Sequence, residues 1–277
     1  MPRATTRGAA ARAPEPITVI IVIRSPNRNP IFLPRLEFFL LTLALETSLR
    51  AGSVALMDDG QLLGEQALDP QRRSAQTLAP AIAELLQACG RTAGQVKLVA
   101  VTIGPGSFTG LRVAVMTAKT FAYAARCDVI GLDTLDVIAA QAPTHLAERD
   151  NAAIHAAIDA QRQELFVAVY QGIGGRGQGT GNTLMRVGET RTVSIESWLS
   201  ELKPKTVVTG PGIDRLEGRL PPGVVIVDAA HRQPMAVTVA GLAGLAYEQG
   251  RRDDLWKLAP IYIRPSAAEE KKGKDEG

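Results

Sequence analysis

The feature that most constrains the fold is a glycine-rich stretch, Gly104–Arg112, which reads Gly-Pro-Gly-Ser-Phe-Thr-Gly-Leu-Arg. Val96–Ile103 before it is apolar and β-branched, as in a central strand, and Leu111–Ala125 after it has helical spacing. Glycines and hydroxyls at a helix start offer backbone N–H groups and the positive end of a helix dipole. The loop could therefore receive an anion or a partner backbone. Equally, it could be a tight strand-to-helix connection with Ser107 or Thr109 as the N-cap.

The sequence lacks the residues that several common catalytic and binding motifs require. No Gly-Lys-Ser/Thr follows the loop, so it is not a P-loop. Pro105 occupies the first glycine position of a nucleophile elbow, which excludes that motif. The three histidines are scattered and form no metallopeptidase pair: His145, His155 and His231. Cys89 and Cys127 are predicted to be small buried hydrophobes, neither a bridge nor a metal site.

Strand-like and helix-like segments alternate after residue 40 in two blocks, each opening with hairpins. The first block has three antiparallel strands, a helix, a central strand, a helix, a strand and a short helix, at Leu41–Glu46, Ser53–Met57, Gln61–Leu68, Ser74–Cys89, Val96–Ile103, Leu111–Ala125, Val129–Leu132 and Thr134–Gln141. The second has strands at Ala152–Ile158, Glu164–Tyr170, Thr183–Thr192, Val207–Val208 and Val224–Val227, with helices at Ser194–Leu202 and Ala236–Gln249. This pattern predicts an α/β protein of two similar halves with mixed sheets.

The net charge of +3 is unevenly spread along the 277 residues. Residues 1–40 hold six Arg and two Glu, so the remaining chain sums to −1, and no basic stripe indicates nucleic-acid binding. The aromatic content of 4% also argues against stacking on single-stranded bases. The apolar run Ile17–Ile23 is too short to span a membrane. We therefore predict a cytoplasmic protein without a membrane segment.

Three weaker features have a functional and a structural interpretation. Glu46-Thr47-Ser48 ends the first strand and could hold a metal-bound water and phosphate, or be a satisfied strand-end turn. Asp159 and Glu164 could form an acid–base pair, but a turn with solvated charges is favoured. Gly172–Gly181 contains six glycines and is predicted to be a mobile hairpin tip.

Together these segments resemble the bacterial TsaB (YeaZ) family of the actin-like ATPase superfamily, from Leu41 to about Arg264. The loop at 104–112 resembles the family signature residue for residue. Further matching segments lie in the family's order at Leu43–Ser48, Ser53–Leu56, Leu78–Pro80, Ala118-Lys119, Ala157–Tyr170, Gly210–Gly212 and Pro260–Arg264. One departure is Glu46, where the family usually has Asp.

The resemblance implies two actin-like (ASKHA, RNase H-like) subdomains with mixed sheets flanked by helices. We expect subdomains at 41–147 and 148–265, with the helix 236–249 packing back on the first. Residues 1–40 would be a disordered or over-called extension, and 266–277 a charged disordered tail.

The implied function is that of a dimerising and activating subunit in the synthesis of N6-threonylcarbamoyladenosine on tRNA, without catalytic activity of its own. Its partners would be the catalytic TsaD subunit and the ATPase TsaE, with a homodimer when alone and tRNA bound only through the complex. No metal and no tightly bound cofactor are expected, although ATP or ADP could bind at the complex interface.

The resemblance also assigns two groups of residues. A vestigial phosphate-loop-like group comprises Glu46, Thr47, Ser48, Gly104, Gly106, Ser107, Thr109 and Gly110. A partner interface on the two helices of the first half comprises Leu78, Ile82, Leu85, Leu111, Val115 and Ala118, although these apolar faces could instead pack on their own sheet.

Two other functions remain open from the residues alone. An autonomous ATPase or small-molecule kinase of the same superfamily would need an acidic metal site, for which Glu46 is the first-strand candidate, and a second phosphate loop at Gly210-Pro211-Gly212. A glycoprotease would need metal ligands that the sequence does not supply.

Overall fold

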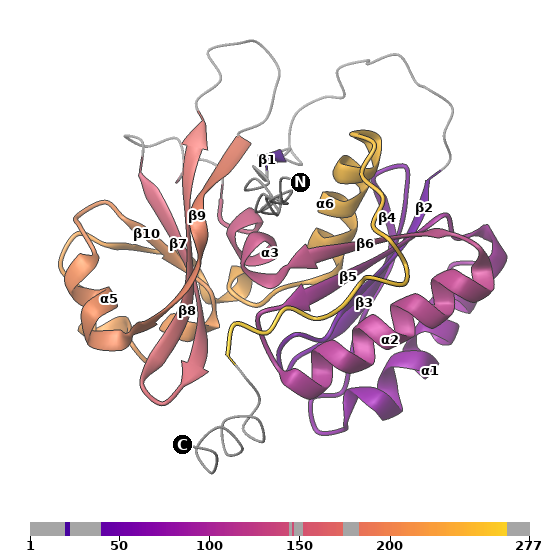
Figure 1. The fold of residues 1–277 in the computed structure, drawn as a ribbon, viewed down its shortest axis with the longest axis horizontal. Coiled ribbons are helices and arrows are strands. Elements are labelled where there is room, and N and C mark those ends of the chain that lie inside the picture. The colour runs from indigo at the N-terminus through magenta and orange to yellow at the C-terminus, as the bar shows by residue number, and fades with distance from the viewer. Residues whose placement is uncertain (1–19, 23–39, 144–145, 147–151, 174–182, 265–277) are drawn as a thin grey trace, which may run out of the picture.

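The computed structural model describes residues 20–22, 40–143, 146, 152–173 and 183–264. These residues form two sheets side by side, each with helices packed against it (Figure 1). Within the described residues, no helix is both long enough and apolar enough to cross a bilayer. The predictions for the rest of 1–40, for 174–182 and for 266–277 fall outside the described residues.

The first sheet has five strands in the order β4-β3-β2-β5-β6. Their bounds are Leu41–Glu46 for β2, Ser53–Asp58 for β3, Gln61–Ala67 for β4, Leu98–Gly104 for β5 and Asp128–Asp133 for β6. The first three pair antiparallel, as predicted, while β5 and β6 run parallel to β2. Both faces of β2 and β5 are covered, and these strands are accordingly almost continuously apolar.

The second sheet repeats this order and gains one strand. Its order is β1-β9-β8-β7-β10-β11, with β7 at Ala153–Gln161, β8 at Glu164–Ile173, β9 at Thr183–Ser194, β10 at Val207–Thr209 and β11 at Val225–Ile226. The strands β7, β8 and β9 are antiparallel, and β10 and β11 run parallel to β7. Because both halves place their strands in the order third, second, first, fourth, fifth, the predicted fold class of two actin-like subdomains is confirmed.

The added strand lies within residues 1–40, which were predicted to be a disordered or over-called extension. β1 (Ile20–Val22) pairs antiparallel with Thr183–Met185 of β9. An apolar run too short for a membrane is long enough to pair with the edge of a sheet.

Helices cover both faces of the first sheet. α1 (Ser74–Ala88) and α2 (Phe108–Ala125) lie on one face, and α6 (Ala236–Glu248) lies on the other against β2 and β3. In the second half, α3 (Thr134–Ala140) packs on β7, and α5 (Ile195–Glu201) follows β9. Short 3-10 turns occur at Ala93–Gln95, Pro211–Ile213, Glu217–Arg219 and Ala229–His231.

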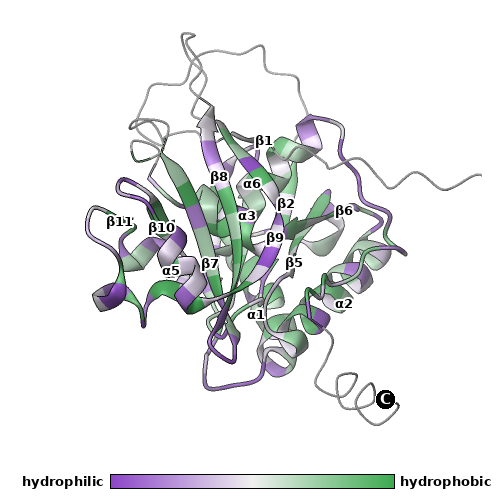
Figure 2. Ribbon diagram, turned by 60° about the vertical axis from the view of Figure 1, so that its left-hand side comes forward, coloured by the Kyte–Doolittle hydropathy of each residue, from purple (hydrophilic) through white to green (hydrophobic). Residues whose placement is uncertain are grey.

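The apolar core is divided by the sheets into layers, and the central strands are largely hydrophobic (Figure 2). Leu78, Leu85 and Val115 fill the layer between the first sheet and its helices. In the second half, Trp198 of α5 is fully buried on the face of the sheet opposite α3. Its Nε1 donates to His155 Nδ1 at 3.3 Å. Burial lowers the pKa of His155 to about 4, so this ring stays neutral in the core.

Candidate functional site

The glycine-rich loop connects β5 to α2 and lies against the end of β2. Ser107 is the N-cap of α2, because its Oγ accepts from the Gly110 amide at 3.3 Å. The helix therefore begins at Phe108, three residues before the predicted start. The structural interpretation with Ser107 as the cap is confirmed.

The loop and the end of β2 are joined by backbone contacts. The Ser107 amide donates to the Ser48 carbonyl oxygen at 2.6 Å, and Thr47 Oγ1 donates to the Gly110 carbonyl oxygen at 2.8 Å. A Cβ atom at Gly106 would lie 2.2 Å from Ser48 O, and one at Gly110 would lie 2.0 Å from Thr47 O. The space above these two glycines is thus filled by the chain's own carbonyl groups.

A similar packing of a glycine-containing loop against a strand occurs in the second half. The loop after β10 contains Gly210 and Gly212, and it packs on Ala157 of β7. A Cβ atom would lie 2.2 Å from Ala157 O at Gly210 and 2.9 Å from it at Gly212. In both halves the glycines therefore allow a loop to close onto the neighbouring strand.

Glu46 is completely buried at the end of β2. Its Oε1 accepts from the Ser48 amide at 2.7 Å and from Ser48 Oγ at 2.6 Å. Its Oε2 has no hydrogen-bond partner within the described part of the chain. Burial raises the pKa of this carboxyl group to about 7, against the opposing effect of the hydrogen bonds from Ser48. Glu46 therefore carries much less negative charge at neutral pH than an exposed glutamate.

These residues do not fit a bound phosphate. The structure does bring the predicted group together, since Glu46–Ser48 contacts Gly104–Gly110. However, the groups above Gly106 and Gly110 are carbonyl oxygens, which repel an anion, and the Ser107 amide is already engaged. The hydroxyl groups of Thr47 and Ser48 are also engaged within the chain, because Thr47 donates to the Gly110 carbonyl oxygen and Ser48 donates to Glu46.

The proposed acid–base pair does not form. Asp159 Oδ1 accepts from the Gln161 amide at 2.8 Å, which shapes the β7–β8 turn. Glu164 forms an ion pair with Arg264, which lies 100 residues later in the sequence. Arg264 also donates to the Ala160 carbonyl oxygen at 3.0 Å. These charges therefore attach the C-terminal segment to the second sheet.

The six residues of the predicted partner interface are buried in the structure of the single chain. All six side chains are buried in the first half: Leu78, Ile82, Leu85, Leu111, Val115 and Ala118 have exposed fractions of 0–5%. Side chains enclosed to this degree by their own chain offer little surface to another protein. The second interpretation of the same apolar faces, that they pack on their own sheet, is correct for these residues.

A buried charge cluster was not predicted. Asp133 caps α3 by accepting from the Leu135 amide at 2.7 Å. Arg186 Nη1 of β9 donates to Asp133 Oδ2 at 2.9 Å and to Asp136 Oδ1 at 3.0 Å, and Tyr170 OH donates to the latter atom at 2.6 Å. The Asp-x-x-Asp spacing at a helix start was the available signal, but nothing in the sequence pointed to Arg186.

This cluster links the two halves. Asp133 ends β6 of the first sheet, whereas Tyr170 and Arg186 belong to the second. Burial and then the charge of Asp133 raise the pKa of Asp136 to about 6. Burial also raises the pKa of Asp133, against the effect of the Arg186 guanidinium. Among the described residues, no group of three or more His, Cys, Asp or Glu could hold a metal ion.

Comparisons with known proteins find similarity to TsaD and to TsaB proteins. The family model of TsaD, described as tRNA N6-adenosine threonylcarbamoyltransferase, matches residues 68–200. The tRNA threonylcarbamoyladenosine biosynthesis protein TsaB of Escherichia coli (strain K12) is 29% identical over 82% of this chain and 95% of its own length. The protein of the same name from Bacillus subtilis (strain 168) is 26% identical over 83% of this chain and 96% of its own length.

A solved structure extends the agreement to three dimensions. YeaZ from Pseudomonas aeruginosa aligns with a TM-score of 0.64 and 28% identity, over 81% of this chain and all of the other. The comparisons support the TsaB (YeaZ) family for this chain. The loop after β5 that resembles the family signature is the loop that closes onto Ser48.

Proposed function

We propose that this chain is an accessory subunit in the synthesis of N6-threonylcarbamoyladenosine on tRNA, paired with a catalytic TsaD-type subunit. Its relatives in Escherichia coli and Bacillus subtilis are named as proteins of this pathway. The match of residues 68–200 to the TsaD model covers α1 and α2. The partner therefore has counterparts of the two helices that cover the first sheet here, which favours a pairing of related surfaces.

The closed loop is the observation that carries the non-catalytic part of the proposal. An actin-like ATPase must receive phosphate groups between its two halves. Here the Ser48 and Thr47 carbonyl oxygens occupy the space over Gly106 and Gly110. Glu46, the candidate acidic residue, is buried, and its carboxyl group is only about half ionised near pH 7. Opening this contact would break hydrogen bonds that close α2 onto β2.

The outer face of the α1–α2 layer is the surface that we assign to the partner. This outer face is exposed, whereas the six residues of the predicted partner interface lie on the buried face of the same helices. α1 exposes the small residues Ala79 and Ala83, and α2 exposes Met116 and Tyr123. Small residues allow close helix approach, and Met and Tyr are enriched in protein interfaces.

Co-purification of the full chain with the TsaD-type subunit of the same organism tests the proposal. We expect a stable hetero-complex by size-exclusion chromatography with light scattering. Threonylcarbamoyl transfer to tRNA should require both subunits. Failure to form a complex, together with ATP turnover by the isolated chain, would overturn the proposal in favour of the autonomous ATPase or kinase.

The remaining partners are proposed on the family resemblance alone. They are a TsaE-type ATPase as a third component, ATP or ADP at the complex interface, and tRNA bound only by the assembled complex. A homodimer of the isolated chain is also proposed, and light scattering of the chain without TsaD measures it.

A further inference from the structure

The segment that follows α6 runs along the outside of the first half as a strap, seen in yellow in Figure 1. We call residues 253–264 the C-terminal strap. The Asp253 amide donates to the Val129 carbonyl oxygen at 3.1 Å, and the Ile261 amide donates to the Ile103 carbonyl oxygen at 2.7 Å. The strap is therefore fixed to β6 at one end and to the end of β5 at the other.

Lys119 of α2 holds the middle of the strap. Its Nζ donates to the carbonyl oxygens of Trp256 and Leu258, each at 3.0 Å. The Trp256 amide donates to Asp254 Oδ1 at 2.8 Å, so the backbone of Trp256 is held on both sides. The Trp256 ring nevertheless remains 73% exposed, edge-on to the Tyr123 ring at a centroid distance of 5.8 Å.

A second aromatic group holds the far end of the strap. The Arg112 guanidinium lies 3.8 Å from the centroid of the Phe108 ring, and its Nε donates to Tyr262 OH at 2.9 Å. The Phe108 and Tyr262 rings lie 4.9 Å apart. The strap and α2 thus form one continuous surface fixed at both ends.

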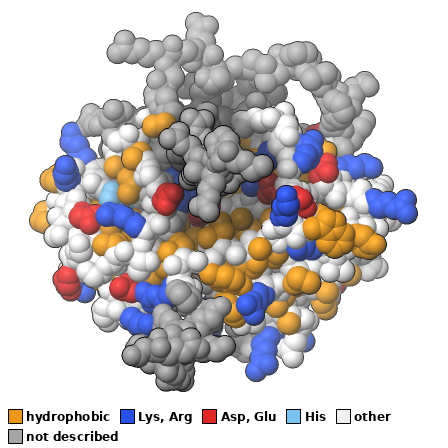
Figure 3. Space-filling view, viewed as in Figure 1, with side chains coloured by type: hydrophobic (Ala, Val, Ile, Leu, Met, Phe, Trp, Pro, Cys, Tyr) orange, Lys and Arg blue, Asp and Glu red, His pale blue; other side chains and the backbone are white. Residues whose placement is uncertain are grey.

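This surface concentrates the exposed apolar side chains of the described structure. Six of the ten large exposed hydrophobic residues lie on it: Phe108, Met116, Tyr123, Trp256, Ile261 and Tyr262. Figure 3 shows hydrophobic side chains gathered over α2 and the strap. A concentration of this kind marks an interaction site more often than scattered apolar residues do.

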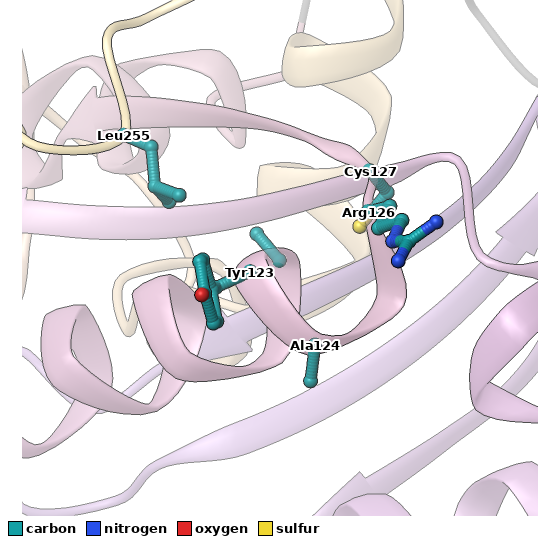
Figure 4. A pocket seen from close by; sticks show the side chains of 6 residues that line it. Tyr123, Ala124, Arg126, Cys127 and Leu255 are labelled. Carbon is teal, nitrogen blue, oxygen red and sulfur yellow. The ribbon is translucent and has the colours of Figure 1, made fainter.

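A pocket of about 460 Å³ opens beside Tyr123, between the end of α2 and the strap (Figure 4). It is lined by Ala122, Tyr123, Ala124, Arg126, Cys127 and Leu255. No carboxylate lines it, and Arg126 makes no ion pair within the described part of the chain. Such a pocket suits an apolar side chain that has a carboxylate next to it.

We propose that Trp256, Tyr123 and this pocket anchor the TsaD-type partner, and that Lys119 acts as a positioning residue by holding Trp256 in place. The proposal rests on the proposed function and identifies the centre of that contact. An exposed Trp whose backbone is already fixed loses little conformational entropy on binding, which favours affinity. Trp and Tyr are also the side chains that most often dominate interface energetics.

Charge favours this partner over a second copy of the chain. α2 contains no Asp or Glu, while Arg112 and Lys119 lie along it and Arg126 follows its last residue. Two copies meeting through this face would bring these cations together at a cost. A partner that presents carboxylates beside its apolar side chains would be attracted instead.

Affinity of the full chain for the purified TsaD-type subunit tests the anchor, measured by titration calorimetry. We expect Trp256→Ala and Tyr123→Ala each to weaken binding by about thirty-fold or more. Leu62→Ala is the matched control, because Leu62 is 48% exposed on β4, away from the strap. It should change affinity by less than about two-fold.

Lys119 is tested by a readout that a merely structural role would not change. Lys119→Met should weaken binding and lower the fluorescence anisotropy of Trp256, measured in a Trp198→Phe background. Lys119→Arg can still donate to both carbonyl oxygens and should restore both readouts. An unchanged anisotropy in Lys119→Met would overturn the positioning role.

The outcomes separate this inference from the proposed function. If the unaltered chain does not bind the TsaD-type subunit, the proposed function is overturned and the anchor with it. If the unaltered chain binds but Trp256→Ala and Tyr123→Ala bind equally well, only the anchor is overturned. A homodimer that Trp256→Ala abolishes, without any TsaD complex, would assign the surface to a second copy and overturn both.

Discussion

The carbonyl oxygen of Ser48 lies 2.2 Å from where a Cβ atom at Gly106 would stand. No real Cβ atom tolerates such a contact with backbone. The signature glycine is therefore required by the chain's own packing, independently of any ligand. The shape of the loop does not depend on a bound anion in this structure, because the backbone of β2 packs directly against it.

Gly106→Ala should destabilise the fold, because either the loop or the end of β2 must move. We expect the free energy of unfolding to fall by about 1–3 kcal/mol, as for other overpacked sites. Gly218→Ala is the control, since nothing lies within 4 Å of its Cβ position. Urea denaturation of both variants measures the difference, and equal stabilities would contradict the closed contact.

Much of the fold could be predicted from local pattern. The strand Leu41–Glu46 was predicted with its observed bounds, and the helix after the signature was missed only at its first turn. Apolar periodicity shows that a face is buried, but it does not show what buries it. For that reason Leu85 and Val115 were assigned to a partner, although their own sheet covers them.

Contacts between distant segments could not be predicted. Arg186 meets Asp133 from 53 residues away, and Lys119 meets Trp256 from 137 residues away. Neither pair has a local sequence signal. The exposed position of Trp256 depends on where the strap lies, which the residues of the strap alone do not determine.

Arg186→Gln should be strongly destabilising. It would leave the buried carboxylates of Asp133 and Asp136 without their cation, and breaking a buried pair typically costs about 3–5 kcal/mol. Arg191→Gln on the same strand is the matched control, because Arg191 and Glu201 are well exposed. That change should cost less than about 1 kcal/mol. Chemical denaturation that gave the two variants similar stabilities would show that the cluster does not hold the halves together.

The pH dependence of stability should identify Glu46. Because folding raises the pKa of its carboxyl group from 4.5 to about 7, the folded state binds the proton more tightly than the unfolded state. This contribution is fully present below pH 4.5 and is lost as the pH rises to about 7, amounting to about 3 kcal/mol.

Glu46→Gln has no ionisable group at this position and should lack that contribution. The difference in unfolding free energy between the two proteins should therefore change between pH 5 and pH 8, and should be constant above that range. Taking this difference removes the titration of Asp136 and His155, which both proteins share. Parallel stability curves across this range would mean that Glu46 is ionised in the folded protein.

Two neighbouring positions on α2 separate folding from partner binding. Val115 is 2% exposed and Met116 is 60% exposed. Val115→Glu places an unpaired carboxylate in the core and should unfold the chain, at a cost of several kcal/mol. Met116→Glu should leave the thermal midpoint of the isolated chain nearly unchanged and weaken its complex with the TsaD-type subunit. Circular dichroism and light scattering on both variants distinguish the effects. A folded Val115→Glu chain would show that this face of α2 is not packed on the sheet, and an unimpaired Met116→Glu complex would place the partner elsewhere.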